Sequence, residues 1–201
     1  MSQPHAVYQW YRTIARQMPV LSKPQAVVLA AFSWGVALSR RCTLRTVAEA
    51  LPRLGKPDTV ERRLQRFVAN PRVDWQAAAQ ALARWVLRGM AQRKVLVLLV
   101  DETSLQEHLK VMVVSVAYRG RALPVAWWCY QQERWPLGQV ELIMTLLEQA
   151  TQSLAPSCRV MVQADRGIGT SPELLAAIAE RGWYFLVRVQ GQVRVRSAGQ
   201  E

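Results

Sequence analysis

Two aspartates in this chain each follow directly after a run of apolar residues. Asp101 ends the stretch VLVLLVD, which begins at Val95, and Asp165 ends the stretch CRVMVQAD, which begins at Cys158. Apolar runs of this kind are typical of β-strands covered on both faces, so each carboxylate is expected at the edge of a core, within reach of a ligand. Carboxylate oxygens are preferred ligands of Mg²⁺. The two aspartates are therefore candidate ligands of a hard cation, and an equally good interpretation is that each caps the turn after its strand.

Three arginines share one face of an expected helix in the first half of the chain. This helix spans TVERRLQRFVA, from Thr59 to Ala69. Its expected buried residues are Val60, Leu64, Phe67 and Val68. Its exposed basic residues are Arg62, Arg63 and Arg66. A short helix and a glycine-containing turn precede it, and such a helix pair resembles a helix-turn-helix DNA reader, so we expect the three arginines to bind DNA.

The charge distribution supports a division of the chain into two modules. Residues 1–94 hold 16 Lys and Arg against 4 Asp and Glu, whereas residues 95–201 hold 10 of each, so the whole net charge of +12 comes from the first part. A basic module joined to a neutral one favours a polyanion-binding domain on a body with a different task. The alternative is a generally basic, solvated helical surface. A hydrophobic content of 51% and a charged content of 20% fit a globular chain.

The hydrophobic pattern predicts helices over residues 8–18, 25–38, 43–51, 59–69 and 74–93. Asp58 and Glu61 have the spacing of a capping box at the start of the fourth helix. The last helix is expected to bury Trp75, Leu82, Trp85 and Met90. We place the domain boundary near Gln92, which gives a helical domain over residues 1–92 and a second domain over residues 93–201.

The second domain alternates strands and helices. Strands are expected from Val95, over residues 109–118 and 122–130, from Cys158 and over residues 183–189, with helices over residues 137–153 and 173–181. The tight turn at residues 119–121 makes the first three strands an antiparallel meander. Three tryptophans of the second domain are expected to pack the sheet against a helix: Trp127, Trp128 and Trp135. Trp135 precedes Pro136 near a turn and could instead stack on a base. The three cysteines of the chain are expected to be reduced core residues: Cys42, Cys129 and Cys158.

This order of elements is that of a ribonuclease-H-like α/β sheet. In such a sheet the first strand is central, and the strand after the first helix lies beside it in parallel. Asp101 and Asp165 would then be neighbours at the same sheet edge. The carboxyl ends of neighbouring parallel strands are where α/β sheets bind ligands.

Several stretches together resemble insertion-sequence transposases of the DDE (retroviral-integrase) superfamily, of the bacterial cut-and-paste type. The matching stretches are VLLVDET, AYRGRALPVAWW and VMVQADRGIGTSPELLAAIAERGWYFLVRV, and TVERRLQRFVANPR resembles the helical DNA-binding domain of the family. The most specific piece is the DRG after the second apolar strand, followed by a helix and then GWYFLVR. The resemblance covers nearly the whole chain.

The resemblance implies an enzyme that cuts double-stranded DNA at transposon ends and joins them to a target. It implies Mg²⁺ as cofactor, with Mn²⁺ as a substitute, and a homodimer paired on DNA. The first two acids of the family correspond to Asp101 and Asp165, which would hold metal ions that activate the attacking hydroxyl and stabilise the leaving oxygen. Glu102 is expected on the opposite side of the strand and is not counted as a ligand. Arg166 could bind a phosphate or form a structural ion pair.

The third acid of the family is a glutamate on a later helix, and no glutamate of this chain is assigned to that position. The candidates Glu173, Glu180 and Glu201 stand in the wrong context, so none of them is assigned. The chain therefore resembles the N-terminal part of a transposase. The expected fold class is α+β/α/β: an all-helical DNA-binding domain followed by an incomplete ribonuclease-H-like mixed sheet with flanking helices.

Two other functions stay open. The chain could be a catalytically inactive transposase remnant that only binds DNA. It could also be a nucleotide-binding α/β protein with GIGTSP (residues 167–172) as a phosphate loop, although the third glycine of the dinucleotide fingerprint and the Lys-Ser/Thr of the P-loop are absent. The N-terminus has no apolar signal core, so a cytoplasmic, nucleoid-associated protein is expected.

Overall fold

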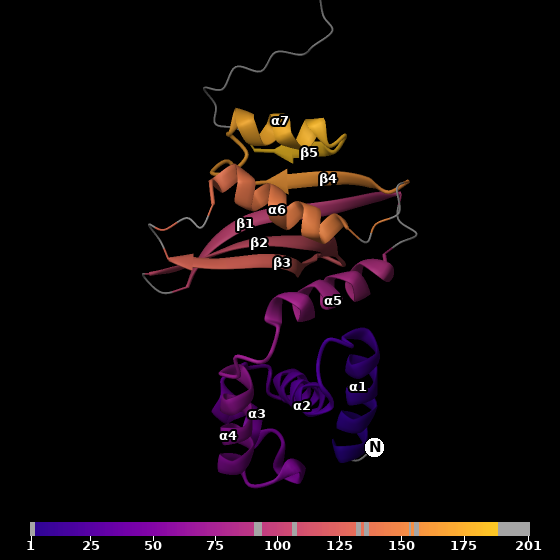
Figure 1. Cartoon of the computed structure of the whole chain (residues 1–201), viewed down its shortest axis with the longest axis vertical. Coiled ribbons are helices and arrows are strands. Elements are labelled where there is room, and N and C mark those ends of the chain that lie inside the picture. The colour runs from indigo at the N-terminus through magenta and orange to yellow at the C-terminus, as the bar shows by residue number, and fades with distance from the viewer. Residues whose placement is uncertain are drawn as a thin grey trace, which may run out of the picture. The chain divides into compact units, whose positions relative to one another are not determined.

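The computed structural model describes residues 3–90, 94–105, 108–131, 134, 137–152, 154 and 157–188 (Figure 1). The chain divides into two compact units, Met1–Leu82 and Ala83–Glu201. The domain boundary predicted at Gln92 lies outside the described residues, and the division between the two units falls within helix α5 (Trp75–Arg88). Within the described ranges, no helix has the length and apolarity that crossing a membrane requires.

The first unit is helical. It contains α1 (Gln3–Gln17), α2 (Lys23–Ser39), α3 (Leu44–Glu49), the short 3₁₀-helix η1 (Pro52–Leu54), α4 (Pro57–Val68) and the first part of α5. Its core includes Ile14, Ala26, Ala30, Val47, Leu51 and Leu64. Helix α2 approaches α3 closely because Gly35 has no side chain: a Cβ there would lie 2.6 Å from Cγ1 of Val47.

The buried stripe of α4 is as predicted except at its end. Val60, Leu64 and Phe67 are buried, but Val68 is 50% exposed. Val68 is the last residue of the helix and is rotated by about 100° from Phe67, so it faces away from the helices that cover the stripe. The prediction that Trp75 points inward is also wrong. Its ring is 44% exposed and packs edge-on against Phe67, with the ring centroids 5.1 Å apart.

The second unit contains a five-stranded mixed sheet. Its elements are β1 (Val95–Leu105), β2 (Leu109–Tyr118), β3 (Arg121–Gln131), α6 (Gln139–Thr151), β4 (Arg159–Ala164), α7 (Pro172–Glu180) and β5 (Tyr184–Val187). The strand order is β3-β2-β1-β4-β5. β1 is antiparallel to β2 and parallel to β4, and β5 is parallel to β4. The predicted fold class, N-terminal helices followed by a ribonuclease-H-like sheet with flanking helices, is confirmed.

The meander turns where the sequence predicted. Arg119 and Gly120 join β2 to β3 with positive φ values of 49° and 73°. Two central residues with positive φ are the mark of a type I′ turn, whose twist matches that of the strands it joins. β2 and β3 thereby pair from Tyr118 with Arg121 to Leu109 with Gln131. β1 pairs with β2 from Leu98 with Val116 to Leu105 with Leu109.

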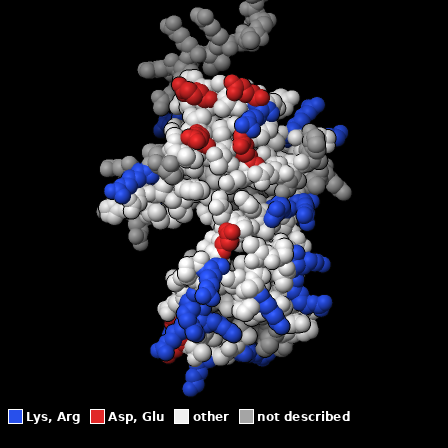
Figure 2. Space-filling view, in the orientation of Figure 1, with Lys and Arg blue, Asp and Glu red and all other residues white. Residues whose placement is uncertain are grey.

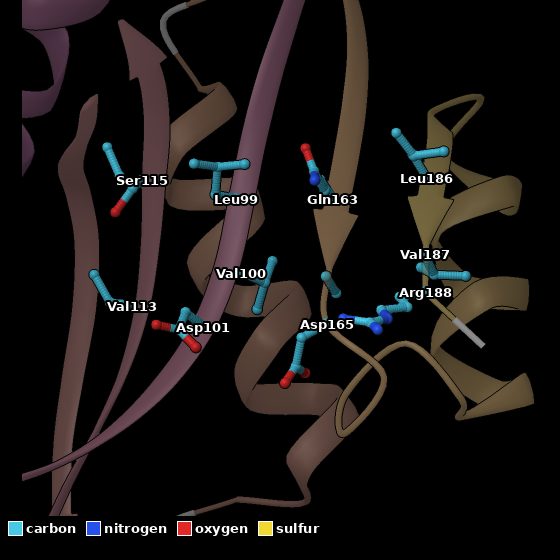
Figure 3. A pocket seen from close by; sticks show the side chains of 12 residues that line it. Leu99, Val100, Asp101, Val113, Ser115, Gln163, Asp165, Leu186, Val187 and Arg188 are labelled. Atoms are coloured by element: carbon cyan, nitrogen blue, oxygen red, sulfur yellow. The ribbon is translucent and has the colours of Figure 1, made fainter. Parts of the chain in front are cut away.

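The two faces of β1 differ in burial. Leu96, Leu98 and Val100 are fully buried in the core to which α6 and α7 contribute, and Figure 3 shows α6 behind the strands. Val97 and Leu99, on the other face, are only half-buried. The prediction that both faces are covered is therefore wrong for the described part of the chain, in which one face of this sheet is only partly covered.

Several predicted core residues are exposed. On β3, which is an edge strand of the sheet, Trp127 and Trp128 are 40% and 37% exposed, and Cys129 is exposed beside them. Cys42 is also exposed, so the prediction of a core residue is wrong for these two cysteines. Cys158 is half-buried and packs against the core. Trp135 lies outside the described residues.

Candidate metal centre and nucleic-acid interface

The sheet places Asp101 and Asp165 side by side. In the parallel pairing of β1 with β4, Val100 lies opposite Ala164. Asp165 is the first residue after β4, whereas Asp101 lies inside β1, which continues along β2 to Leu105, so the prediction that Asp101 ends its strand is wrong. Asp101 is the first residue of β1 beyond the pairing with β4, and this brings the two aspartates next to each other. Both line an open hollow of about 570 Å³ (Figure 3). The first strand supplies Asp101 from its uncovered face, and the end of the fourth strand supplies Asp165.

Asp101 is exposed in this hollow, and no described residue donates a hydrogen bond to its carboxylate. Its neighbour Glu102 lies on the covered face instead, where it accepts hydrogen bonds from Lys110 and Tyr130. Burial raises the pKa of Glu102, but the hydrogen bonds from Lys110 and Tyr130 outweigh it, so the pKa is lower than usual. Glu102 therefore forms hydrogen bonds within the sheet, whereas Asp101 points into the hollow.

Asp165 has a second role in the turn after β4. Its Oδ1 accepts hydrogen bonds from the backbone N–H groups of Gly167 at 2.9 Å and Ile168 at 3.2 Å. The interpretation that the aspartate caps its turn therefore holds for this oxygen. The other oxygen, Oδ2, accepts no hydrogen bond from a described residue, so it is the atom of Asp165 that could ligate a cation.

The loop after Asp165 is closed on itself. The N–H of Gly169 donates to the carbonyl of Asp165 at 2.7 Å. A Cβ at Gly169 would lie 2.7 Å from Cβ of Val187, so only glycine fits. The backbone N–H groups of residues 167–169 are thus already bonded to Asp165, and they cannot cradle a phosphate. This geometry argues against the nucleotide-binding interpretation of GIGTSP.

Three polar residues that were not singled out from the sequence also line the hollow: Ser115, Gln163 and Arg188. Figure 3 shows the Arg188 side chain extending from the end of β5 towards β4. The signal for Arg188 was present, because it ends the GWYFLVR stretch. Ser115 and Gln163 gave no signal, since only the strand register reveals which face a residue occupies. Arg166 is exposed, and no described carboxylate lies within ion-pair distance of it.

The residues of the hollow fit a hard divalent cation in part. Asp101 and Asp165 supply carboxylate oxygens, the donors that Mg²⁺ prefers, and the open hollow leaves room for the waters that Mg²⁺ keeps. Among the described residues no group of three or more His, Cys, Asp or Glu side chains could hold a metal ion. Neither Glu173 nor Glu180 lines the hollow. Glu201 lies outside the described residues.

The first unit carries a basic surface. Figure 2 shows Lys and Arg side chains scattered over its visible face, with few acidic residues. Arg62, Arg63 and Arg66 are all exposed on α4, and no described carboxylate forms an ion pair with any of them. They border two shallow hollows, one with Gln65 and the other with the start of α2. The arginine face predicted from the sequence is therefore present and available to an anion.

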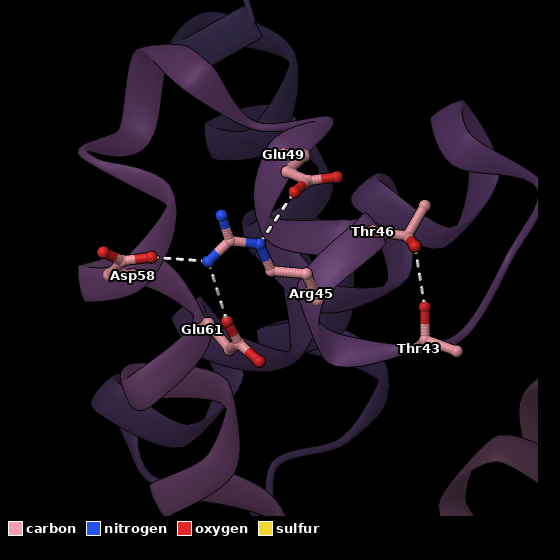
Figure 4. A network of polar contacts seen from close by, with 6 residues as sticks. All are labelled: Thr43, Arg45, Thr46, Glu49, Asp58 and Glu61. Atoms are coloured by element: carbon pink, nitrogen blue, oxygen red, sulfur yellow. Dashed lines mark hydrogen bonds and ion pairs between the residues drawn. The ribbon is translucent and has the colours of Figure 1, made fainter.

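Arg45 of α3 binds three of the four acidic residues of the same unit, and the fourth, Asp74, accepts a hydrogen bond from the N–H of Ala77. The guanidinium of Arg45 contacts the carboxylates of Glu49 at 2.7 Å, Asp58 at 2.5 Å and Glu61 at 3.4 Å (Figure 4). These hydrogen bonds raise the pKa of Arg45 above its usual value.

The predicted capping box of Asp58 and Glu61 is wrong. Helix α4 begins at Pro57, two residues before the predicted start at Thr59, so its N-cap is Lys56 and not Asp58. Both acids bind Arg45 instead of the helix end.

The fold and the paired aspartates define an α/β protein with a ribonuclease-H-like sheet and a candidate two-carboxylate cation site at its edge. Comparison with protein families adds a particular similarity: residues 35–122 match the family described as DDE superfamily endonuclease. The matched stretch covers less than half of the 201 residues. It includes Asp101 and all of α4, and it ends before Asp165. No curated protein matches the chain.

Proposed function

We propose that this chain is the DNA-cutting part of a transposase, a metal-dependent enzyme that cleaves DNA at the ends of a mobile element and transfers the strand. The observation that carries the proposal is the pairing of Val100 with Ala164, because Asp101 and Asp165 are the residues that directly follow this last pair of the parallel strands. The similarity of residues 35–122 to DDE superfamily endonucleases supports the same reaction class. Double-stranded DNA is the proposed substrate, and a homodimer on two DNA ends is the proposed assembly.

Each residue of the hollow has a proposed task. Asp101 and the Oδ2 atom of Asp165 would hold Mg²⁺ or Mn²⁺. When bound, such ions activate the attacking hydroxyl and stabilise the leaving oxygen. Arg188 would hold a phosphate of the scissile strand, because guanidinium and phosphate form charge-assisted hydrogen bonds. The turn that Asp165 caps keeps β4, α7 and the end of β5 together.

The proposed site can be tested first by metal binding. We expect the unaltered chain to bind Mn²⁺, measured by calorimetry or by the loss of the free-ion electron spin resonance signal. Asp101→Asn and Asp165→Asn should each weaken this binding by at least about tenfold, because a neutral amide replaces a charged ligand. Glu180→Gln is the matched control, since it removes one exposed carboxylate outside the hollow. Equal Mn²⁺ affinity in all four proteins would contradict the site.

Metal-dependent cutting is the second test. We expect nicking of duplex DNA with Mg²⁺ or Mn²⁺ and none with a chelator. A second candidate function is favoured by one observation: the described residues supply two carboxylates and no third. On that alternative the chain binds DNA and metal but does not cut alone. Binding of duplex DNA without metal-dependent nicking would support this DNA-binding function.

A further inference from the structure

The start of α2 and the end of α4 enclose a hollow of about 310 Å³. Its lining residues are Pro24, Gln25, Val28, Arg63, Arg66, Phe67 and Asn70. Val28 and Phe67 form apolar parts of the lining, and two arginines and two amides provide the polar groups. No carboxylate belongs to the lining. An anion in this hollow would therefore meet donors without meeting a like charge.

The two walls of the hollow are tied together by Gln25. Its Oε1 accepts a hydrogen bond from the N–H of Ser22 at 2.8 Å, which caps α2. Its Nε2 donates to the carbonyl of Arg72 at 3.2 Å, beyond the end of α4. The N–H of Arg72 in turn donates to Oδ1 of Asn70 at 3.0 Å. The arginines thus lie on a wall whose position is set by hydrogen bonds, which reduces the ordering cost of binding a ligand.

A second shallow hollow adjoins the first along α4. It is lined by Arg62, Gln65 and Arg66, so Arg66 belongs to both. The three arginines follow one another at helix positions that lie on a common face. An extended anion with repeated charges would contact all three, whereas a single small anion would contact one or two.

The first turn of α4 has a different character. A helix-turn-helix reader places the first residues of its second helix against base edges. Here that end carries Asp58 and Glu61, which share Arg45 with Glu49. The exposed Lys56 and Arg62 flank this cluster, so the three carboxylates and the three cations leave this end of the helix close to neutral. Phosphates would therefore be attracted less strongly to this end of the helix than to the end that carries Arg63 and Arg66.

We propose, on the basis of the DNA-binding function proposed above, that α4 grips the phosphate backbone of duplex DNA through Arg62, Arg63 and Arg66 and does not read base sequence. The hollow between α2 and α4 seats one backbone phosphate, and the adjoining hollow seats the next. Binding through this surface is therefore insensitive to sequence and depends steeply on salt, because each neutralised phosphate releases counterions.

The test uses the full chain and three labelled duplexes of equal length and unrelated sequence, with affinity measured by fluorescence anisotropy over a salt series. We expect the double variant Arg63→Ala/Arg66→Ala to lose affinity about 10- to 100-fold, equally for all three duplexes. The slope of log affinity against log salt should fall by about 2, close to ~0.9 for each lost phosphate contact. Arg12→Ala/Arg16→Ala is the matched control, because it removes two exposed arginines from α1 and should change little.

Two further variants keep the test decisive. Arg63→Lys/Arg66→Lys should keep most of the salt slope, because the charges remain. Thr59→Ala, in the exposed first turn of α4, should leave the ratio of affinities for the three duplexes unchanged. A changed ratio with Thr59→Ala, or an equal loss in the α1 control, would overturn the proposed mode of contact while DNA binding itself stands. Absence of binding to every duplex would instead overturn the proposed function.

Discussion

The helical unit and the sheet unit treat their charged residues in opposite ways. In the helical unit, three carboxylates converge on Arg45, and the arginines of α4 have no described carboxylate partner. In the sheet unit, Lys110 and Tyr130 converge on one carboxylate, Glu102, and the neighbouring Asp101 has no described donor. One unit thus leaves cations for a ligand, and the other leaves carboxylates.

The difference indicates how the proposed function is divided. Exposed cations on a helix attract a polyanion and supply affinity, whereas carboxylates in a hollow repel it unless a metal ion lies between them. Binding and cutting should therefore be separable by mutation. In both units the charges paired within the protein support the framework. On the proposed function the ligand meets Arg62, Arg63, Arg66 and Asp101, for which the described residues supply no oppositely charged partner.

The largest expected effects come from two sets of variants, one that loses cutting but keeps DNA affinity and one that loses DNA affinity but keeps cutting. Asp101→Asn should abolish metal-dependent cutting and leave duplex affinity within about twofold, since the asparagine removes no cation from the binding surface. Replacing Arg62, Arg63 and Arg66 with alanine should do the reverse: affinity falls by about 100-fold or more at low salt, and cutting persists at saturating DNA. Nicking assays and anisotropy on the same preparations measure both. Full cutting by Asp101→Asn would remove this residue from the proposed site, and an unchanged salt slope in the triple variant would place the DNA surface elsewhere.

The next effect concerns the loop that supports Asp165. Gly169→Ala should destabilise the fold by about 1–3 kcal/mol, because its Cβ would lie 2.7 Å from Val187 and the core must shift. Gly167→Ala is the matched control in the same loop. Its Cβ would meet Asp165 at 3.4 Å, an ordinary contact, so the expected change is within about 0.5 kcal/mol. Chemical denaturation measures both, and equal losses would mean that the loop is not held by close packing at Gly169.

Much of this architecture was predictable from local patterns. The apolar runs before Asp101 and Asp165 predicted two strands, and the order of elements predicted that the strands are parallel neighbours, as the pairing of Val95 with Arg159 shows. The exposed arginines of α4 followed from its helical period. The strands and the arginine face follow from local periodicity, and the parallel pairing follows from general rules for connecting consecutive elements.

What the sequence did not reveal depends on which surfaces are covered. Trp127 and Trp128 were predicted to pack the sheet against a helix, but on β3 they are 40% and 37% exposed. Arg45 contacts Asp58 and Glu61, which lie 13 and 16 positions further along the chain, and helical periodicity does not predict contacts over such separations. Arg188 joins the hollow only because β5 lies beside β4. Such contacts are set by tertiary packing, which overrides local preference.

A smaller effect separates the two aspartates. Asp165→Ala should cost about 1 kcal/mol of stability, because it leaves the N–H groups of Gly167 and Ile168 without their acceptor. Asp165→Asn should keep most of this stability, since the amide oxygen still accepts. Asp101→Ala should be within about 0.5 kcal/mol of the unaltered chain. If Asp101→Ala were as costly as Asp165→Ala, the carboxylate of Asp101 would have a structural partner, and the contrast between the two acids would fail.

The smallest effect tests the hydrogen bond between Tyr130 and Glu102 on the core-facing side of the sheet. Tyr130→Phe removes one hydrogen bond to Glu102 and should cost about 1 kcal/mol at neutral pH. Tyr184→Phe, on an exposed tyrosine, is the control and should change little. The pKa of Glu102 is lowered in the folded protein from its ordinary value of 4.5. The contribution of the Glu102 carboxylate to the free energy of unfolding is therefore present above pH 4.5, and it is lost as the pH falls through the lowered pKa. The difference between Tyr130→Phe and the unaltered chain should shrink at acid pH. A difference that stays constant would mean that the tyrosine acts through packing alone, and that the charge on Glu102 is not what fixes the end of β1.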